Sequence, residues 1–292
     1  MDPTPSTNAI MPKVSCVVLN WNGWADTLAC LASLATQNWQ ALEVIVVDNG
    51  STDDSVTRIR EAFPQITLLE AGGNLGFSRG NNVGIRHAMQ RGAHYVWLLN
   101  NDTVAPPDTC EKLVRKAQSE PRAGLIGSVL HYMHAPDQVQ AWGGGRVNAL
   151  LGISEHFTAP ATFGRDGYMT FASVFIPREV IERVGLMYEG AFMYWEDSDY
   201  AFRVTAAGYG LAVAEDTRIL HKEGASNIPR TPRTDRYATT SGLHFLKRHS
   251  PAPWFSMPFF VAMRCLNRLA RGRWPNVRAV LQGVTDYRKN GA

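Results

Sequence analysis

Short apolar runs alternate with amphipathic segments over the first hundred residues of the chain. The apolar runs at residues 14–22, 42–48 and 95–99 fit strands that are buried on both faces of a sheet. Between them, the period of the apolar positions predicts helices at residues 27–37, 56–63 and 83–92, a short strand at residues 66–71 and a glycine-rich loop at residues 72–82. This alternation predicts an α/β fold with a mostly parallel sheet flanked by helices.

The second half of the chain continues the pattern less regularly. A helix and a strand are expected at residues 109–119 and 123–130, followed by an irregular excursion over residues 131–166 that we interpret as an acceptor-binding insertion. A strand and a helix at residues 169–185, a helix at residues 200–207 and a strand at residues 211–224 come next, and from about residue 237 the chain is helical. We therefore divide the chain into a flexible lead (residues 1–12), a main α/β domain (residues 13–246) and a C-terminal helical appendage (residues 247–292).

The composition argues against several classes of protein. The 292 residues carry a net charge of only +3 and no nucleic-acid recognition motif, so nucleic acid is not an expected partner. The four cysteines lie far apart without a CxxC pair, which favours a reducing compartment over a disulfide framework or a zinc site. The sequence shows neither a signal-peptide pattern nor an uncharged apolar run of about 20 residues, so we expect a cytoplasmic protein.

Three of the predicted strands end in polar side chains, which are Asn20, Asn22, Asp48, Asn100, Asn101 and Asp102. The carboxyl ends of parallel strands meet at one edge of the sheet, and open α/β sheets bind their ligands there. Asn and Asp also favour turns, so each strand end taken alone fits a turn. The coincidence of three such ends favours a binding site.

His221 ends the last predicted strand, and beside Asp102 it would be a second protein ligand for a divalent cation. Diphosphate oxygens would fill the remaining positions, and such an oxygen-rich site suits Mg²⁺ or Mn²⁺. Asp48 has two open interpretations, a hydrogen bond to a base or ribose and the start of an Asx-turn. The loop at residues 72–82 matches neither dinucleotide nor P-loop patterns, but its glycines would let the backbone approach a nucleotide, with Asn74 and Arg79 as donor contacts.

Three acidic residues, Glu196, Asp197 and Asp199, stand just before the helix predicted at residues 200–207. One acidic residue would suffice to cap the helix and complement its dipole. Three within four positions repel one another, which favours a role beside a cation or a positively charged substrate group. We expect Trp195, Glu196 and Asp199 to contact or support an acceptor.

Five segments of the chain together carry a resemblance to one family: VSCVVLNWNG, VIVVDNGSTDDS, NLGFSRGNN, LLNNDT and YWEDSDYAFR. In this order they resemble the family 2 glycosyltransferases, which have the GT-A fold, over roughly residues 14–246. NLGFSRGNN and LLNNDT are most similar to the rhamnosyltransferase-type branch, which builds O-antigen and other bacterial surface polysaccharides. Where many members have a TGA-like stretch, this chain has TFAS at residues 170–173, so the identity of the sugar is left open.

The resemblance implies a role for each matching residue. Asp48 would contact the base of the nucleotide, and Asn100, Asn101 and Asp102 stand at the DxD motif, with Asp102 as the metal-binding acid. His221 matches a metal-ligating histidine. Asp197 matches the catalytic base. Asn20, Asn22, Asn74 and Arg79 would complete the site of the nucleotide-sugar donor.

The implied reaction is an inverting, metal-dependent transfer of a hexosyl group, L-rhamnose from dTDP-L-rhamnose, to a hydroxyl of a growing lipid-linked surface polysaccharide. A cation at Asp102 and His221 would stabilise the negative charge that accumulates on the departing diphosphate. Asp197, which is ionised at neutral pH with an ordinary pKa near 3.9, would accept the proton of the acceptor hydroxyl.

Three alternatives remain open. The donor can be a UDP-sugar instead, because pocket shape rather than a motif decides this choice. A nucleotidyltransferase of related architecture would carry a glycine-rich basic signature after its first strand, where this chain reads NWNGWADT. A non-catalytic nucleotide-sugar-binding subunit is disfavoured by the joint presence of Asp102, Asp197 and His221.

The appendage at residues 247–292 mixes aromatic and basic residues, and it has two interpretations of equal weight. It either forms a helical hairpin packed on the main domain or contacts the inner face of the cytoplasmic membrane, because basic helices with an aromatic face attract anionic lipid.

Overall fold

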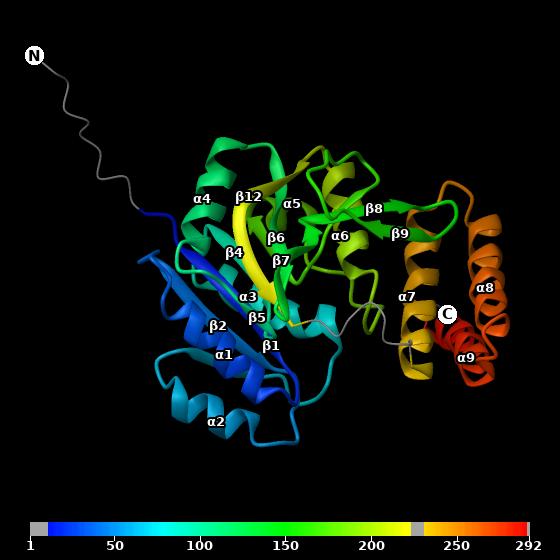
Figure 1. The fold of residues 1–292 in the computed structure, drawn as a ribbon, viewed down its shortest axis with the longest axis horizontal. Helices are drawn as coiled ribbons and strands as arrows, with labels where there is room; N and C mark the ends of the chain where they lie inside the picture. Colours follow the sequence, from blue (N-terminus) through cyan, green and yellow to red (C-terminus); the bar gives the residue numbers. More distant parts are fainter. Residues whose placement is uncertain (1–10, 223–230, 291–292) are drawn as a thin grey trace, which may run out of the picture.

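The computed structural model describes residues 11–222 and 231–290, so most of the expected lead and the last two residues of the strand predicted at residues 211–224 lie outside it. Its first half alternates strands and helices as expected (Figure 1). In order these are β1 (Val14–Asn20), α1 (Trp24–Leu34), β2 (Leu42–Asp48), α2 (Ser55–Ala62), β3 (Thr67–Glu70), α3 (Phe77–Gln90), β4 (Tyr95–Asn100) and β5 (Thr103–Val104).

The second half contains more strands than the sequence pattern indicated. Its elements are α4 (Thr109–Ser119), β6 (Ala123–Tyr132), β7 (Ala135–Trp142), β8 (Gly144–Asn148), β9 (Ile153–His156), β10 (Gly167–Met169), β11 (Ser173–Pro177), α5 (Arg178–Val184), α6 (Glu196–Ala206) and β12 (Gly210–His221). Three helices follow, α7 (Pro232–His249), α8 (Pro253–Leu269) and α9 (Trp274–Asn290).

A nine-stranded sheet forms the centre of the molecule, in the order β3-β2-β1-β4-β11-β6-β12-β5 with β7 beside β6. The strands β3, β2, β1 and β4 run parallel, and β11 pairs antiparallel with both β4 and β6. Apolar side chains on both faces form two core clusters, one on each side of the sheet. The predicted α/β fold with helices flanking a mostly parallel sheet is confirmed.

The glycine-rich stretch differs from its prediction, because most of it is helical. Helix α3 begins at Phe77, six residues before the expected start, directly after Gly76 with φ 83°. Gly80 and Gly84 lie within α3 and allow it to pack closely on β1. A Cβ atom on Gly84 would stand 2.4 Å from a methyl carbon of Val17, and one on Gly80 would stand 2.6 Å from a methyl carbon of Leu19. The glycines of this stretch therefore serve packing as well as turns.

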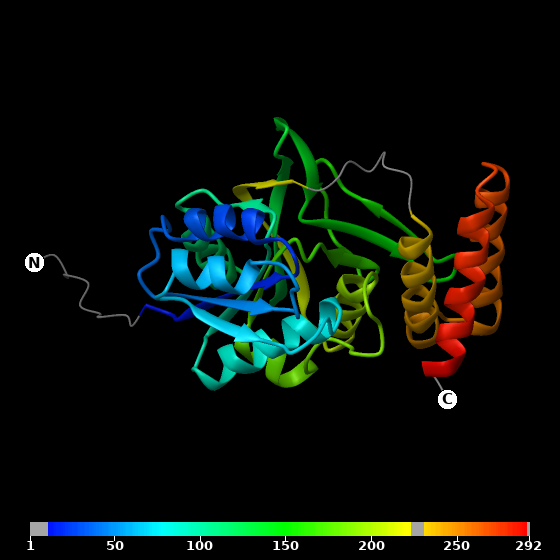
Figure 2. The same ribbon diagram turned by 90° about the horizontal axis from the view of Figure 1, so that it is seen from below.

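The excursion predicted as irregular contains ordered strands. β7 joins the main sheet beside β6, while β8, β9 and β10 form a second, three-stranded antiparallel sheet in the order β10-β8-β9. The β8–β9 hairpin extends toward the C-terminal helices (Figures 1 and 2). At its tip, a Cβ atom on Gly152 would stand 2.6 Å from the ring of Phe260 in α8, so the hairpin touches these helices directly.

The helices α7, α8 and α9 stand together at one end of the molecule (Figure 2). The predicted boundary at residue 246 falls inside α7, which begins at Pro232 after Thr231 caps its first turn through a bond from the Thr234 amide. The three helices contact one another, and Phe260 of α8 contacts Trp195 of the main domain. These contacts agree with the interpretation of a packed helical hairpin. Within the described residues, no helix has the length and apolar character that crossing a bilayer requires.

A buried carboxylate joins the three C-terminal helices. Asp235 in α7 is fully buried and accepts hydrogen bonds from Arg264 and Arg268 of α8 at 2.8 and 2.7 Å and from Asn276 of α9 at 2.8 Å. Burial alone would raise the pKa of Asp235, but the bonds from Arg268 and Asn276 and the arginine charges lower it below its ordinary value.

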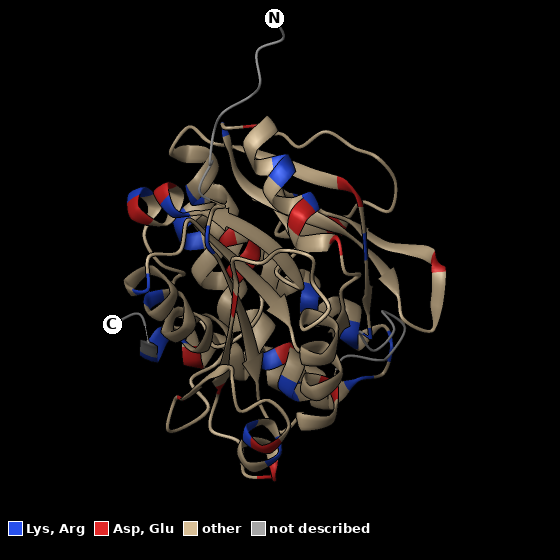
Figure 3. Cartoon of the chain, turned by 90° about the vertical axis from the view of Figure 1, so that its left-hand side faces the viewer, with Lys and Arg blue, Asp and Glu red and all other residues tan. Residues whose placement is uncertain are grey.

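Elsewhere acidic and basic positions are interspersed along the chain (Figure 3).

We expect Asp235→Ala to lower the free energy of unfolding by about 3–5 kcal/mol, because it leaves the buried guanidinium of Arg264 and the half-buried one of Arg268 without their carboxylate. Urea denaturation measures this change. The matched control is Asp286→Ala, which removes the more exposed ion pair to Arg236 and should cost less than about 1 kcal/mol. Equal losses in the two variants would contradict the importance of the buried cluster.

Candidate functional site

The polar ends of β1, β2 and β4 lie side by side at one edge of the sheet. Parallel pairing sets Asn20 opposite Asp48 and Leu19 opposite Asn100. The fully buried Asn20 donates to Asp48 at 2.8 Å and accepts from Thr27 Oγ1 at 2.7 Å. The strand ends are thus joined by side-chain hydrogen bonds as well as by backbone pairing.

The carboxylate of Asp48 is occupied by bonds within the protein. It accepts from the backbone N–H and the hydroxyl of Ser51, at 2.9 and 2.6 Å, in addition to Asn20. These bonds stabilise the turn after β2, with the amide three residues on rather than the two of an Asx-turn. Contact between Asp48 and a base stays a prediction.

Other predicted donor residues shape the loops around this edge. Asn22, with φ 50°, accepts from the Thr52 amide at 2.8 Å, and Asn101 donates to Thr27 Oγ1 at 3.0 Å. Asn74 accepts from the Gly76 amide at 3.0 Å, at the start of α3. Arg79 instead donates to the carbonyl of Glu189 at 3.0 Å.

Asp102 and His221 meet because the chain turns after β4 and pairs β5 antiparallel with the end of β12. Thr103 lies opposite His221, and the Lys222 amide donates to the Asp102 carbonyl at 2.9 Å. The distance from His221 Nε2 to Asp102 Oδ1 is 3.2 Å. Burial acts to raise the pKa of Asp102, but the hydrogen bond and charge of His221 lower it below its ordinary value.

Gln140 of β7 orients the ring of His221. Its Oε1 lies 2.8 Å from His221 Nδ1 and accepts a hydrogen bond when that nitrogen carries the proton. In the neutral ring with its proton on Nδ1, the lone pair of Nε2 points at the Asp102 carboxylate. Two hydrogen-bond acceptors then face each other, and a proton or a cation between them removes their repulsion. An imidazole nitrogen and a carboxylate oxygen fit Mn²⁺ or Mg²⁺, although the described residues contain no cluster of three or more such ligands.

The segment before α6 has an unusual backbone. Tyr194 and Trp195 have φ of 74° and 68°, a left-handed conformation that costs a bulky residue about 1–3 kcal/mol. Trp195 packs against Phe245 and Phe260, with ring centroids 4.9 and 5.9 Å apart. This strained turn sets the position of Asp197 in the first turn of α6.

Asp197 and Glu196 form a carboxylate pair with raised pKa values. Burial and the neighbouring charge of Asp197 raise the pKa of Glu196 to about 8, and its Oε2 is buried without a hydrogen-bond partner among the described residues. Burial also raises the pKa of Asp197, while bonds from Ser198 and the imidazole of His156 oppose the rise. A carboxylate with a raised pKa is a stronger base than an ordinary aspartate.

Asp199 faces a different direction from Asp197. Its carboxylate contacts Arg248 and His249 of α7, both at 2.7 Å, and Arg203 at 3.1 Å. These contacts lower its pKa below the ordinary value even though burial opposes the change. Asp199 therefore ties α6 to α7, which accounts for one of the three clustered acids.

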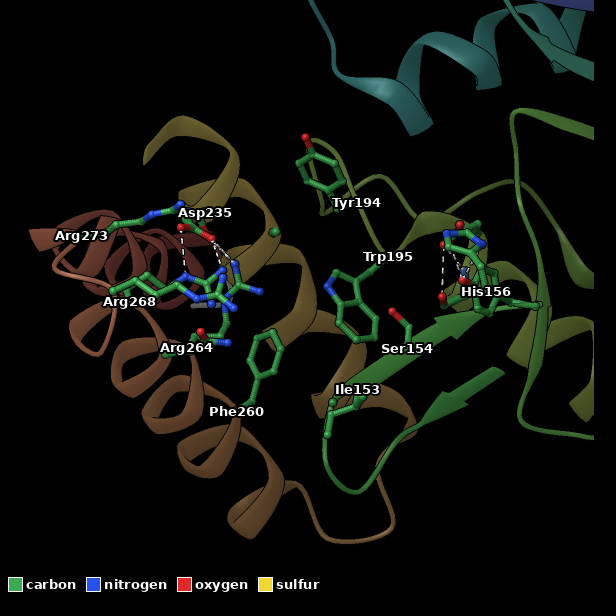
Figure 4. A pocket seen from close by; sticks show the side chains of 17 residues that line it. Ile153, Ser154, His156, Tyr194, Trp195, Asp235, Phe260, Arg264, Arg268 and Arg273 are labelled. Carbon is green, nitrogen blue, oxygen red and sulfur yellow. Dashed lines mark hydrogen bonds and ion pairs between the residues drawn. The ribbon is translucent and has the colours of Figure 1, made fainter. Parts of the chain in front are cut away.

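Asp197 lines a pocket of about 750 Å³ between the β8–β9 hairpin, the start of α6 and the C-terminal helices (Figure 4). His156, Tyr194, Trp195 and Phe260 also line it. Asp102 and His221 are not among the residues that line this pocket.

Sequence reasoning missed His156 and Gln140. Both lie in the excursion, where no regular period predicted strands. Gln140 meets His221, and His156 acts on Asp197, only through the tertiary fold. A histidine and a glutamine on strands carry no recognisable spacing, so the sequence offered no signal for either residue.

Two family models match the chain. The model described as glycosyl transferase family 2 matches residues 15–159, and the one described as glycosyl transferase family group 2 matches residues 95–277. The chain belongs to glycosyltransferase family 2. The predicted glycosyltransferase activity and the family assignment are therefore confirmed.

Relatives of known name share most of the length of this glycosyltransferase. It is 26% identical to N-acetylglucosaminyl-diphospho-decaprenol L-rhamnosyltransferase of Mycobacterium tuberculosis, over 80% of this chain and 83% of that protein. It is 23% identical to a dTDP-rhamnosyl transferase of Shigella flexneri, over 82% of each chain. The solved structure of a mannosyltransferase from Pyrobaculum calidifontis in complex with GDP-Man and Mn²⁺ matches 97% of this chain and 76% of its own, with a TM-score of 0.61 and 19% identity, which shows the shared fold.

We expect His156→Gln to raise the pKa of Asp197 further, because the imidazole is one of the groups that lower it. Carbon-13 NMR titration of the aspartate carboxyl carbons measures this pKa. His87→Gln, on α3 and outside the pocket, should leave it unchanged. A pKa of Asp197 that is the same in all three proteins would show that His156 does not act on it.

Proposed function

We propose that this glycosyltransferase transfers L-rhamnose from dTDP-L-rhamnose, with inversion, to a hydroxyl of a glycan acceptor in the synthesis of a bacterial surface polysaccharide. The observation that carries the proposal is the pairing of Asp102 with His221 at the sheet edge, together with a basic carboxylate, Asp197, in the wall of a pocket. The names of the relatives from Mycobacterium tuberculosis and Shigella flexneri support rhamnose as the transferred sugar.

In this proposal the donor lies along the ends of β1, β2 and β4, with its diphosphate toward Asp102. Asp102 and His221 would hold a Mg²⁺ or Mn²⁺ ion, which when bound neutralises negative charge on the leaving diphosphate. Gln140 keeps the ring of His221 in the orientation that directs Nε2 at Asp102.

Asp197 acts on the acceptor. Its carboxylate removes the proton from the attacking hydroxyl while the sugar–phosphate bond breaks, and a single displacement inverts the anomeric centre. Burial and the neighbouring charge raise the pKa of Glu196 to about 8, so Glu196 favours its protonated form at neutral pH and adds little repulsion to the carboxylate of Asp197. Trp195 offers an aromatic face beside the base for the acceptor sugar.

A lipid-linked acceptor also fits the outer surface of the C-terminal helices. Several large apolar side chains there are exposed, among them Trp254 at 81%, Trp274 at 65% and Leu266 at 59%. With the arginines nearby, these residues support peripheral contact with the inner face of the cytoplasmic membrane.

The donor is tested by thermal shift of the full chain with a panel of nucleotide sugars and Mn²⁺. We expect dTDP and dTDP-L-rhamnose to raise the Tm more than UDP-glucose, UDP-galactose and GDP-mannose. A ligand that binds the native state stabilises it by mass action, so the nucleotide that binds most tightly gives the largest shift. Asp197→Asn should keep this shift while its transfer activity drops by at least a hundredfold. A response to UDP-sugars alone would replace rhamnose as the donor sugar, and retained turnover in Asp197→Asn would remove this residue as the base.

The cation site is tested through Gln140, which touches neither the donor nor the cation in this proposal. We expect Gln140→Leu to weaken Mn²⁺ binding in the presence of dTDP by about 10–100-fold, because His221 loses the group that orients it. Isothermal titration calorimetry measures the affinity. Gln138→Leu, an exposed position on the same strand, is the control and should bind Mn²⁺ as the unaltered protein does. Unchanged affinity in Gln140→Leu would contradict the assignment of the cation to this pair.

A further inference from the structure

The pocket that contains Asp197 has a second end with a different chemistry. Figure 4 shows Arg264, Arg268 and Arg273 at one end and His156 at the other, with Trp195 between them. These arginines come from the last third of α8 and from the turn into α9, and Arg271 joins them in lining the pocket.

Two of the four arginines already have a carboxylate and two do not. Arg264 and Arg268 are held on the buried Asp235. In the part of the chain that the structure describes, Arg271 and Arg273 take part in no ion pair and no side-chain hydrogen bond. One carboxylate thus stands among four guanidinium groups, and the arginine end of the pocket carries excess positive charge.

This end is also partly rigid. The bonds from Asp235 fix Arg268, whose Nε and Nη2 both donate to the carboxylate, so its remaining donors keep a constant direction. Guanidinium groups match the oxygens of a phosphate with paired donors and are weakly hydrated, which makes a cluster of them a good phosphate-binding surface.

Apolar surface begins where the arginines end. Leu269 follows Arg268 on α8 and Trp274 follows Arg273, and both are exposed; Leu266 is exposed as well, on the opposite face of α8. The pocket therefore presents, in order, a base at Asp197, an aromatic wall at Trp195, a cationic end and an apolar exterior. An acceptor with the same order of groups consists of a sugar, a phosphate ester and an apolar chain.

We propose that Arg271 and Arg273, supported by Arg268, bind the phosphate or diphosphate that links the acceptor sugar to its lipid. The inference rests on the proposed function, since it assigns the pocket to the acceptor. The acceptor sugar stacks on Trp195 with one hydroxyl at Asp197, its phosphate lies between the arginines, and its chain leaves over the exposed face of α8. A pocket of about 750 Å³ lies within the usual range for small-molecule sites.

The test uses inorganic pyrophosphate and farnesyl diphosphate as probes of the full chain, in EDTA and with saturating dTDP, so that the donor edge is filled. Isothermal titration calorimetry should show that Arg271→Gln/Arg273→Gln binds both probes at least tenfold more weakly than the unaltered protein. The control, Arg278→Gln/Arg288→Gln, removes the same charge from exposed positions of α9 outside the pocket and should bind both probes normally. Equal losses in the two double variants, or none in the first, would overturn the assignment.

A second arm separates the acceptor's phosphate from lipid headgroups. Vesicles of phosphatidylglycerol should bind both double variants equally if Arg271 and Arg273 serve the pocket. A loss of vesicle binding confined to Arg271→Gln/Arg273→Gln, with probe affinity unchanged, would assign these arginines to the membrane surface instead and overturn the proposal.

The outcome is independent of the donor assignment. The Tm shift with dTDP and Mn²⁺ should be the same in both double variants, because neither changes the sheet edge. If the unaltered protein binds the diphosphate probes through Arg271 and Arg273 but responds to no dTDP ligand, the phosphate site stands and the proposed donor fails. Loss of the dTDP shift together with probe binding in Arg271→Gln/Arg273→Gln would show general damage, and it would remove the support for a separate phosphate site.

Discussion

Parallel pairing of β1 with both β2 and β4 is the constraint on which the candidate site depends. Because the register places Asn20 opposite Asp48 and Leu19 opposite Asn100, three strands end at the same level. The short β5 then turns back and pairs with the end of β12, which brings His221 to Asp102. Backbone hydrogen bonding thus sets the positions of residues that are more than a hundred positions apart in the chain.

Two buried carboxylates join the helices of the C-terminal half to one another. Asp199 joins α6 to α7 through Arg248 and His249, and Asp235 joins α7 to α8 and α9 through two arginines. Removing one partner from such a cluster costs several kcal/mol of stability. Each carboxylate therefore holds its helices together about as strongly as a core side chain does. Together they hold the C-terminal helices beside Asp197 and form the far wall of the pocket.

The pocket changes electrostatic character along its length. At one end Asp197 has a raised pKa, and at the other the arginines have more positive charge than their single carboxylate balances. The backbone strain at Tyr194 and Trp195 lies between these ends. Strain of this kind persists where the surrounding packing enforces it, here through Phe245 and Phe260, and it is common at functional sites.

The sequence by itself determined the fold class, the family and the positions of the polar strand ends, because buried parallel strands leave continuous apolar runs and their ends are marked by Asn and Asp. It also singled out Asp102, Asp197 and His221, whose roles stay predictions. It placed the start of α3 wrongly, since Gly80 looks like a loop residue until β1 is packed against it. Only the tertiary structure decided that Asp199 and Asp235 join helices through ion pairs. It also decided that Gln140 contacts His221 and that His156 and the arginines near the C-terminus share a pocket with Asp197. These relations arise from contacts between elements far apart in the chain, and no local period or propensity encodes them.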